Sequence, residues 1–199
     1  MSMMTAGFAA PVLAAQTTFR AMLNATARPG TVHPITSAVA APAAFSAAMA
    51  ALVLTLCDHD TPIWLDAGLR PMEAVAAWLR FHCGSTIVDD ARAAAFALVS
   101  NPSQVPPFEH FHTGTPDYPD RSTTVVLQVE SLRSGPALTL AGPGIQTKHT
   151  LWASSLPQDF RARIAANRSL FPCGVDLVLV AANEVAALPR SVRVVDAED

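Results

Sequence analysis

The chain has 199 residues, of which 51% are apolar and only 15% are charged, and its formal net charge at pH 7 is −3. This composition excludes an intrinsically disordered chain and offers no basic surface for the backbone of a nucleic acid. The length suits one α/β unit, so we expect a single domain over residues 1–199. With so few charges, part of the apolar surface is expected to be covered by other subunits.

The N-terminal sequence MSMMTAGFAAPVLAAQTTF resembles a secretory signal only faintly, because no positive charge precedes its apolar part and Pro11 interrupts it. We therefore expect a cytoplasmic protein. Residues 35–57 carry no charge, but Pro42 and the abundance of Ala and Ser argue against a membrane span. A buried helix followed by a strand explains this segment better.

In the first half of the chain, apolar spacing predicts a helix over residues 16–27, which the turn Arg28-Pro29-Gly30 ends. Small residues favour a second helix over 43–50. The short apolar run LVLTLCD over 52–58 is typical of a buried strand, which would place the polar cluster CDHD at its carboxyl end. The clearest helix follows Pro71, with Val75, Trp78 and Leu79 on one face and Gly84 as its C-terminal cap.

The second half begins with a predicted buried strand over 93–100 and a long proline-rich loop, which is expected to be functional or to bind a partner. Strands over 123–129 and 137–141 are predicted to pair as a hairpin, followed by the tight turn GPGI. A helix near 157–171 turns Phe160, Ile164 and Ala165 inward, and strands near 175–182 and 190–195 complete the chain. Strands that alternate with helices predict an α/β fold with a mixed sheet flanked by helices.

Three polar clusters have both a chemical and a structural interpretation. CDHD offers metal ligands or an acid and a base, but its spacing matches no zinc pattern, and a turn stabilised by Asp58 explains it better. His110 and His112 would point the same way in an extended chain, yet a solvated or interface pair is the better interpretation. The glycines of GPGI allow backbone N–H groups to approach an anion, but a simple tight turn explains them equally well.

The remaining reactive residues narrow the chemistry further. Cys57, Cys83 and Cys173 are odd in number and widely spaced, so we expect reduced thiols and neither a disulfide framework nor a metal site. Lys148 is the only lysine, so any Schiff base would have to form there. Anion recognition would otherwise depend on arginines beside turns, among them Arg28 and Arg121, for which a surface or partner contact is the simpler explanation.

Six segments in order, together covering nearly the whole chain, resemble the PhnH family of the bacterial carbon–phosphorus lyase system, which breaks down phosphonates. They are FRAMLNATARPGTVHPI, LTLCDHDTPIWLD, WLRFHCG, GTPDYPDRSTTVVLQV, LTLAGPGI and the stretch from NRSLFPCGVDLVLV to LPRSVRV. Each motif is weak alone, and their series is specific. Residues 1–15 lie outside the resemblance, which allows them to be flexible.

The resemblance implies a cytoplasmic subunit that works with PhnG, PhnI and PhnJ, and that forms a homodimer when isolated. In that system a phosphonate displaces adenine from ATP to give a ribose 1-phosphonate 5-triphosphate. The family fold is similar to the large domain of pyridoxal-phosphate transferases without the cofactor, so no cofactor is expected and Lys148 is not expected to form a Schiff base.

Two functions remain open from the sequence. The first is an accessory subunit, which the low charge and the lack of a recognisable catalytic constellation favour. The second is a direct contributor that binds nucleotide or phosphonate in an anion pocket, which needs mainly positioning and charge stabilisation. The candidate residues for a ligand or partner site are Arg28, Asp58, Asp60, Arg121, Gly142, Gly144 and Arg190. Asp176 is interpreted as structural, at the entry of the strand over 175–182.

Overall fold

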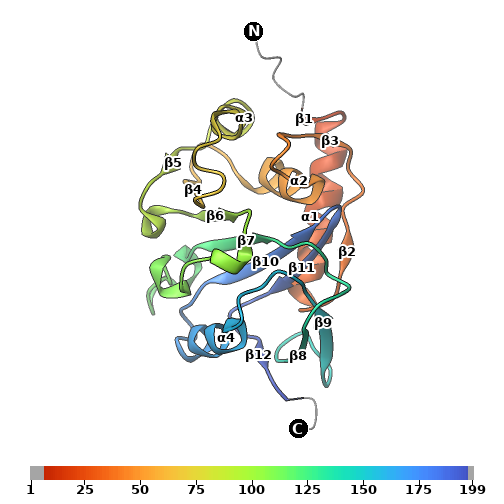
Figure 1. Ribbon diagram of the computed structural model, residues 1–199, viewed down its shortest axis with the longest axis vertical. Helices are drawn as coiled ribbons and strands as arrows, with labels where there is room; N and C mark the ends of the chain where they lie inside the picture. Colours follow the sequence, from red (N-terminus) through yellow and green to blue (C-terminus); the bar gives the residue numbers. More distant parts are fainter. Residues whose placement is uncertain (1–6, 197–199) are drawn as a thin grey trace.

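The computed structural model describes residues 7–196 and has three layers around a seven-stranded mixed sheet (Figure 1). The helices are α1 (Pro11–Ala27), α2 (Ala47–Leu56), α3 (Glu73–Cys83) and α4 (Phe160–Ser169). The strands of the main sheet, in spatial order, are β2 (His33–Pro34), β11 (Glu184–Leu188), β10 (Asp176–Ala181), β7 (Thr124–Gln128), β6 (Phe96–Val99), β4 (Ile63–Leu65) and β5 (Ile87–Val88). This architecture confirms the predicted α/β class and the mixed sheet.

Two smaller sheets complete the fold. One pairs β1 (Gly7–Phe8) with β3 (Val39–Ala40) beside α1. The other has the order β12 (Arg193–Val194), β8 (Ala137–Ala141) and β9 (His149–Trp152), and it lies on the same side of the main sheet as α4 (Figure 1). Among the described residues, no helix is long and apolar enough to cross a membrane.

The main sheet is buried on both faces, and its strands alternate between two apolar clusters. Along β10, Val178 and Val180 contact the cluster formed with α1, α2 and α3, whereas Leu177 and Leu179 contact the cluster formed with α4 and the β8–β9 hairpin. Strands β5, β4, β6, β7 and β10 are parallel. Buried parallel strands of this kind read as continuous apolar runs, which is why β6 and β10 were predictable.

The run LVLTL over residues 52–56 is helical, so the predicted strand over residues 52–58 is wrong. It forms the second half of α2, in which every residue from Ala48 to Val53 is buried. A helix that is apolar on all sides shows no 3.6-residue period and cannot be told from a buried strand by its pattern. The side chain of Ser46 caps α2 by accepting the N–H of Met49 at 3.1 Å.

The predicted hairpin of residues 123–129 and 137–141 is also wrong, although both strands exist. β7 lies in the centre of the main sheet between β6 and β10, and β8 pairs instead with β9 and β12. Strands β9 and β11 were not predicted. The first helix begins at Pro11, earlier than expected, so residues 7–15 belong to β1, α1 and their connection, whereas residues 1–6 lie outside the described residues.

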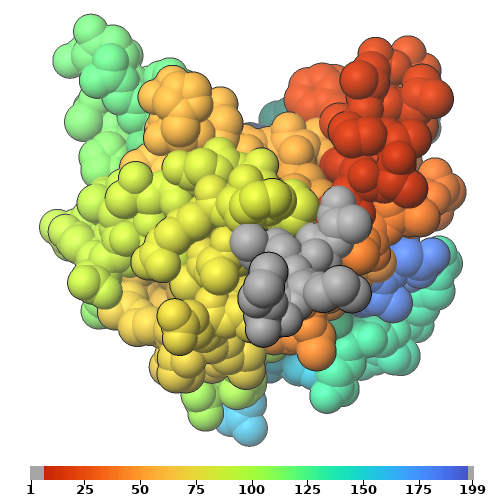
Figure 2. Space-filling view, turned by 90° about the horizontal axis from the view of Figure 1, so that it is seen from above, coloured from red at the N-terminus to blue at the C-terminus, as the bar shows by residue number. Residues whose placement is uncertain are grey.

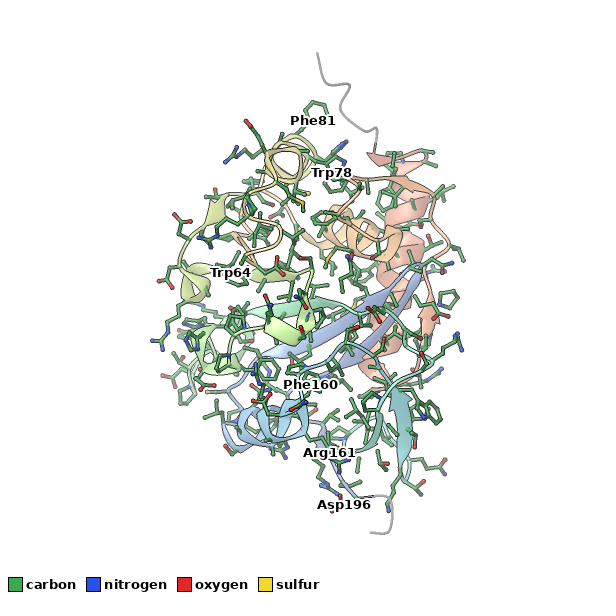
Figure 3. The ribbon with its side chains drawn as sticks, in the orientation of Figure 1. Trp64, Trp78, Phe81, Phe160, Arg161 and Asp196 are labelled. Carbon is green, nitrogen blue, oxygen red and sulfur yellow. The ribbon has the colours of Figure 1, made fainter. Side chains whose placement is uncertain are left out.

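The helix α3 agrees closely with its prediction. It ends at Gly84, whose φ of +67° is left-handed, and Val75, Trp78 and Leu79 are buried. Trp78 turns toward α2 and meets the ring of Phe45 edge-on at 5.9 Å, whereas Phe81 turns away from the molecule (Figure 3). In α4, Phe160 and Ile164 are buried as predicted, but Ala165 is exposed.

Candidate functional site

Three segments that are far apart in the sequence meet at the end of the sheet where β10 begins. Gly144 packs against the turn that follows α1, so closely that a Cβ there would lie 2.3 Å from the carbonyl oxygen of Ala27. Gly142 lies beside Ser191 and Val192 in the same way. The structure thus brings Arg28, Gly142 and Gly144 together, and the backbone that follows Arg190 joins them.

The side chain of Arg190 is committed to contacts within the protein. Its Nε donates to Asp176 at 3.1 Å, Nη2 donates to Asp176 and to Ser122, and Nη1 donates to the carbonyl oxygen of Pro119. The backbone N–H of Arg190 also donates to Asp176 at 2.8 Å. This pair fixes the proline-rich loop to the start of β10, which explains why an aspartate and an arginine flank the apolar strands β10 and β11.

Arg121 lies in the same loop but faces solvent, with its guanidinium 4.2 Å from the centre of the Tyr118 ring. Arg28 is exposed too, and its side chain has no hydrogen bond or ion pair with residues 7–196. Of the three candidate arginines, Arg28 and Arg121 therefore present their guanidinium groups at the surface.

Asp58 and Asp60 lie away from this group. They follow α2 and precede β4, and β6 and β7 separate β4 from β10, a distance of roughly 14 Å at the usual strand spacing. Asp58 accepts the N–H of Asp60 at 2.9 Å, and its carbonyl oxygen accepts the hydroxyl group of Ser85 at 2.7 Å. Both acids therefore belong to a hydrogen-bonded turn, in agreement with the structural interpretation of CDHD.

The thiols near this turn are held in the protonated form. Burial, the nearby Cys83 and Asp58 raise the pKa of Cys57, and burial followed by Asp58 raises the pKa of Cys83 to about 11. Within residues 7–196, no group of three or more His, Cys, Asp or Glu side chains is arranged to hold a metal ion. His112 instead accepts the N–H of Gly114 through Nδ1 at 3.1 Å.

Sequence reasoning missed Asp66, which lies at the carboxyl ends of β4 and β6. The chain leaves β4 toward β5 on one side and returns to β6 on the other, and such switch points commonly bind ligands in α/β proteins. Here the buried carboxylate accepts N–H groups from Leu69 at 2.9 Å, Ser100 at 2.7 Å and Asn101 at 3.0 Å. Donors within the protein thus satisfy the carboxylate of Asp66. Its hydrogen bonds join the loop that follows β4 to the loop that follows β6.

Three surface cavities of similar size differ in their charge. A cavity of about 400 Å³ contains three acids, Asp89, Asp90 and Glu109, together with Arg92. One of about 390 Å³ contains Glu130 as its charged residue. The third, of about 420 Å³, lies between the turn after α1 and strand β9. It is lined by Gly30, Thr31, Val32, Leu132, Arg133, His149, Thr150, Leu151 and Trp152. This third cavity adjoins the junction of Arg28 with Gly144.

Sequence reasoning did not identify this third cavity, because β9 was not recognised and its other walls come from distant segments. Gly30 closes one side: a Cβ there would lie 2.5 Å from Leu140 and 3.0 Å from the ring of His149. On the other side, Arg133 forms an ion pair with Glu184 through Nε at 2.9 Å. The cavity therefore has an arginine–glutamate ion pair on one wall and a tightly packed floor.

Comparisons with known proteins agree with the sequence resemblance. The sequence model of the family described as "Bacterial phosphonate metabolism protein (PhnH)" matches residues 6–195. The chain is 43% identical over 186 residues to "Alpha-D-ribose 1-methylphosphonate 5-triphosphate synthase subunit PhnH" of Rhizobium meliloti (strain 1021), which covers 94% of this chain and 92% of the relative. It is 31% identical to "Putative C-P lyase subunit protein HtxG" of Stutzerimonas stutzeri, over 90% and 85% of the two chains.

Proposed function

This chain belongs to the PhnH family of bacterial phosphonate metabolism proteins, and we propose that it is a subunit of a carbon–phosphorus lyase complex. In that complex it is required for the step that forms an α-D-ribose 1-phosphonate 5-triphosphate from a phosphonate and ATP, with displacement of adenine. The observation that carries this proposal is the 43% identity to a named synthase subunit over almost the full length of both chains. The expected partners are PhnG, PhnI and PhnJ, in the cytoplasm.

The deciding experiment is reconstitution of the complex with and without this chain. We expect the complete complex to release adenine from ATP in the presence of methylphosphonate, and the complex that lacks this chain to lose that activity. Full synthase activity without the chain would overturn the proposed function.

An accessory role is supported by the outer face of α1. Val12, Leu13, Phe19 and Leu23 are all exposed, with Phe19 at 49% and Leu23 at 52% of their full exposure. The helix runs along one side of the molecule (Figure 1), and its N-terminal part projects at one corner when seen from above (Figure 2). Arg20 is the sole charged residue within the helix. Exposed apolar faces of this size mark contacts with other chains. We infer that α1 carries the contact with a partner subunit or with a second copy in the isolated homodimer.

The variant that tests this contact replaces Phe19 and Leu23 by glutamine, which keeps the helix polar, uncharged and intact. We expect it to fold normally but to fail in assembly with the partner subunits, as measured by size-exclusion chromatography with light scattering. Leu170→Gln, at an equally exposed position after α4, is the matched control and is expected to assemble. Normal assembly of the double variant would exclude α1 as the contact.

A direct role in the reaction is the second candidate, and the meeting of Arg28 with Gly142 and Gly144 favours it. The test is Arg28→Ala in the reconstituted complex, since Arg28 is exposed and its loss leaves the fold intact. Normal assembly with loss of adenine release would make this chain a contributor to the site. Unchanged turnover would make it an accessory subunit.

We further infer that the fold is that of the large domain of pyridoxal-phosphate transferases, used here without the cofactor. The parallel part of the sheet with helices on both faces supports this relation. The purified protein is expected to show no absorbance band of an internal aldimine. A band that disappears in Lys148→Ala would contradict the inference.

A further inference from the structure

The cavity beside β9 differs from the other two in the balance of its charged groups. Glu184 is paired with the lining residue Arg133, so this pair is neutral as a whole. His149 lines the cavity, and Arg28 lies at the other end of the turn that contributes Thr31. The two other cavities have carboxylates in their lining, whereas this one has none. Of the three cavities, this one therefore repels an anion least.

The hydrogen-bond donors of this cavity suit phosphate oxygens. The guanidinium group of Arg133 projects with 67% of its side chain exposed, and its Nη1 is left over from the contacts with Glu184. Strand β9 is an edge of the three-stranded sheet, so alternate backbone N–H groups along it have no partner strand. Guanidinium groups, imidazole and backbone N–H groups are the usual phosphate donors in proteins.

His33, which follows the turn after α1, carries a proton on Nε2 and donates it to Thr31. The hydroxyl group of Thr31 donates to the carbonyl oxygen of Arg28 at 2.7 Å, so its oxygen must accept from Nε2 of His33 at 2.8 Å. This chain of hydrogen bonds fixes the turn 28–33 on the side of the cavity that faces β9. The turn therefore fixes the backbone of Arg28 at one end of the cavity.

The far wall of the cavity is aromatic. Trp152 lies at the end of β9 with 46% of its surface exposed, and it lines the cavity. An exposed indole in a cavity of about 420 Å³ provides a flat apolar surface for the face of a sugar or a base. The volume lies within the range of small-molecule sites.

We propose that the cavity between the turn 28–32 and strand β9 binds a ribose 5-triphosphate, with the phosphates at Arg28, Arg133 and His149 and the ring system against Trp152. The inference rests on the proposed function, because the 5-triphosphate of ribose is the chemical class that the relative's name gives for the product. It adds a binding site on this subunit. The ligand carries a base before the reaction and a phosphonate after it, and the triphosphate and ribose are common to both.

The test is calorimetric titration of the isolated chain, and of the assembled complex, with three probes: ATP, inorganic tripolyphosphate and adenosine. We expect ATP and tripolyphosphate to bind and adenosine not to bind. Arg133→Gln and Arg28→Gln should each weaken ATP binding about tenfold or more. Trp152→Leu should weaken ATP binding but leave tripolyphosphate binding unchanged, and should remove the fluorescence change that ATP causes.

Two matched controls separate the site from general effects of charge. Glu184→Gln breaks the same ion pair as Arg133→Gln but keeps the cation, so it should bind ATP at least as tightly as the parent chain. Arg193→Gln removes an exposed arginine elsewhere and should have no effect. Equal affinity in all variants, or no binding of ATP and tripolyphosphate in either form of the protein, overturns the proposal.

The outcomes also separate this site from the proposed function. Binding that depends on Arg28 and Arg133 in a chain that does not support synthase activity would retain the site and reject the function. A complex that is active with unchanged kinetics in both arginine variants would retain the function and reject the site.

Discussion

The guanidinium group of Arg190 joins three segments that are distant in the sequence. It contacts Asp176 at the start of β10, Ser122 at the end of the proline-rich loop and the backbone of Pro119. The side chain of Arg190 is only 13% exposed and that of Asp176 is 36% exposed, so the pair is largely withdrawn from water. In such a place the loss of one partner is costly, because the other charge is left without compensation.

We expect Arg190→Ala to lower the free energy of unfolding by about 2 kcal/mol, below the range for fully buried pairs because Asp176 keeps some solvent. Urea denaturation followed by circular dichroism measures this. Arg193→Ala, an exposed arginine in β12, is the control and should change stability by less than about 0.5 kcal/mol. Equal stability of the two variants would mean that the pair does not hold the loop.

His33 gives the stability a dependence on pH. Burial, and to a lesser extent the charge of Arg28, lowers the pKa of His33 below its usual value. The unfolded chain therefore binds this proton at a higher pH than the folded protein does. Stability that is present above the unfolded pKa, near 6.5, is lost as the pH falls through that value, and the loss levels off below the folded pKa.

The measurement compares the urea midpoint at pH 7.5 and at pH 5.5 for the parent chain and for His33→Gln. We expect the parent to lose more stability on acidification than the variant, because glutamine can still donate to Thr31 but does not titrate. His110, in the proline-rich loop, supplies the control, and His110→Gln should keep the parent's response. An unchanged response in His33→Gln would contradict the assignment.

At the scale of the elements, a helix was predictable where local end signals and an amphipathic period occur together. Pro71, Gly84 and the spacing of Val75 and Trp78 carry local information, so α3 was predicted almost to the residue. The sequence of α2 contains no such local information, because a helix that is buried on every side has no polar face to reveal its period. The strands β7 and β8 were identified, but their pairing was not, because β7 pairs with β10 and β8 pairs with β12, and both partners lie far along the chain.

The candidate site shows the same division. The turns that contain Arg28 and Gly144 were identifiable from their glycines and prolines, and the hypothesis of an anion pocket placed both in one candidate site. Trp152, Arg133 and His149 were not suggested by any motif, because they come together only when β9 folds back beside the turn after α1. A cavity formed by distant segments leaves no local pattern in a single sequence.

Two glycines with left-handed φ angles provide a matched test of turn geometry. At Gly84 a Cβ would meet nothing closer than 3.7 Å, so Gly84→Ala should cost about 1 kcal/mol for the φ angle alone. At Gly144 a Cβ would also strike the carbonyl oxygen of Ala27, so Gly144→Ala should cost about 3 kcal/mol. Thermal or urea unfolding measures the free energy that each variant loses. Equal losses in the two variants would show that the turn at Gly144 is not tightly packed.

At the scale of the whole molecule, the two apolar clusters share the strands of one sheet. Val126 in β7 contacts one cluster, and its neighbours Val125 and Leu127 contact the other. If one cluster loses its packing, the shared strands lose their support and the apolar side chains of the other cluster become exposed as well. We therefore expect residues 7–196 to unfold as one cooperative unit, in agreement with the prediction of a single domain.

The check is whether two probes report the same transition. Far-ultraviolet circular dichroism follows the helices and strands, and tryptophan fluorescence in Trp152→Phe follows Trp64 and Trp78, which lie on opposite sides of the sheet. Coincident midpoints in urea are expected. Two separated midpoints would mean that the layers fold independently.

The two ends of the main sheet have a consequence for assembly. The edge strands β2 and β5 are only two residues long, and Pro34 in β2 has no N–H to offer to an incoming strand. Asp89 and Asp90 follow β5 directly and place charges next to its open edge. A chain with exposed apolar surface that waits for partners is at risk of stacking into fibres, and these blunt edges keep its copies from adding strands to one another while the complex forms.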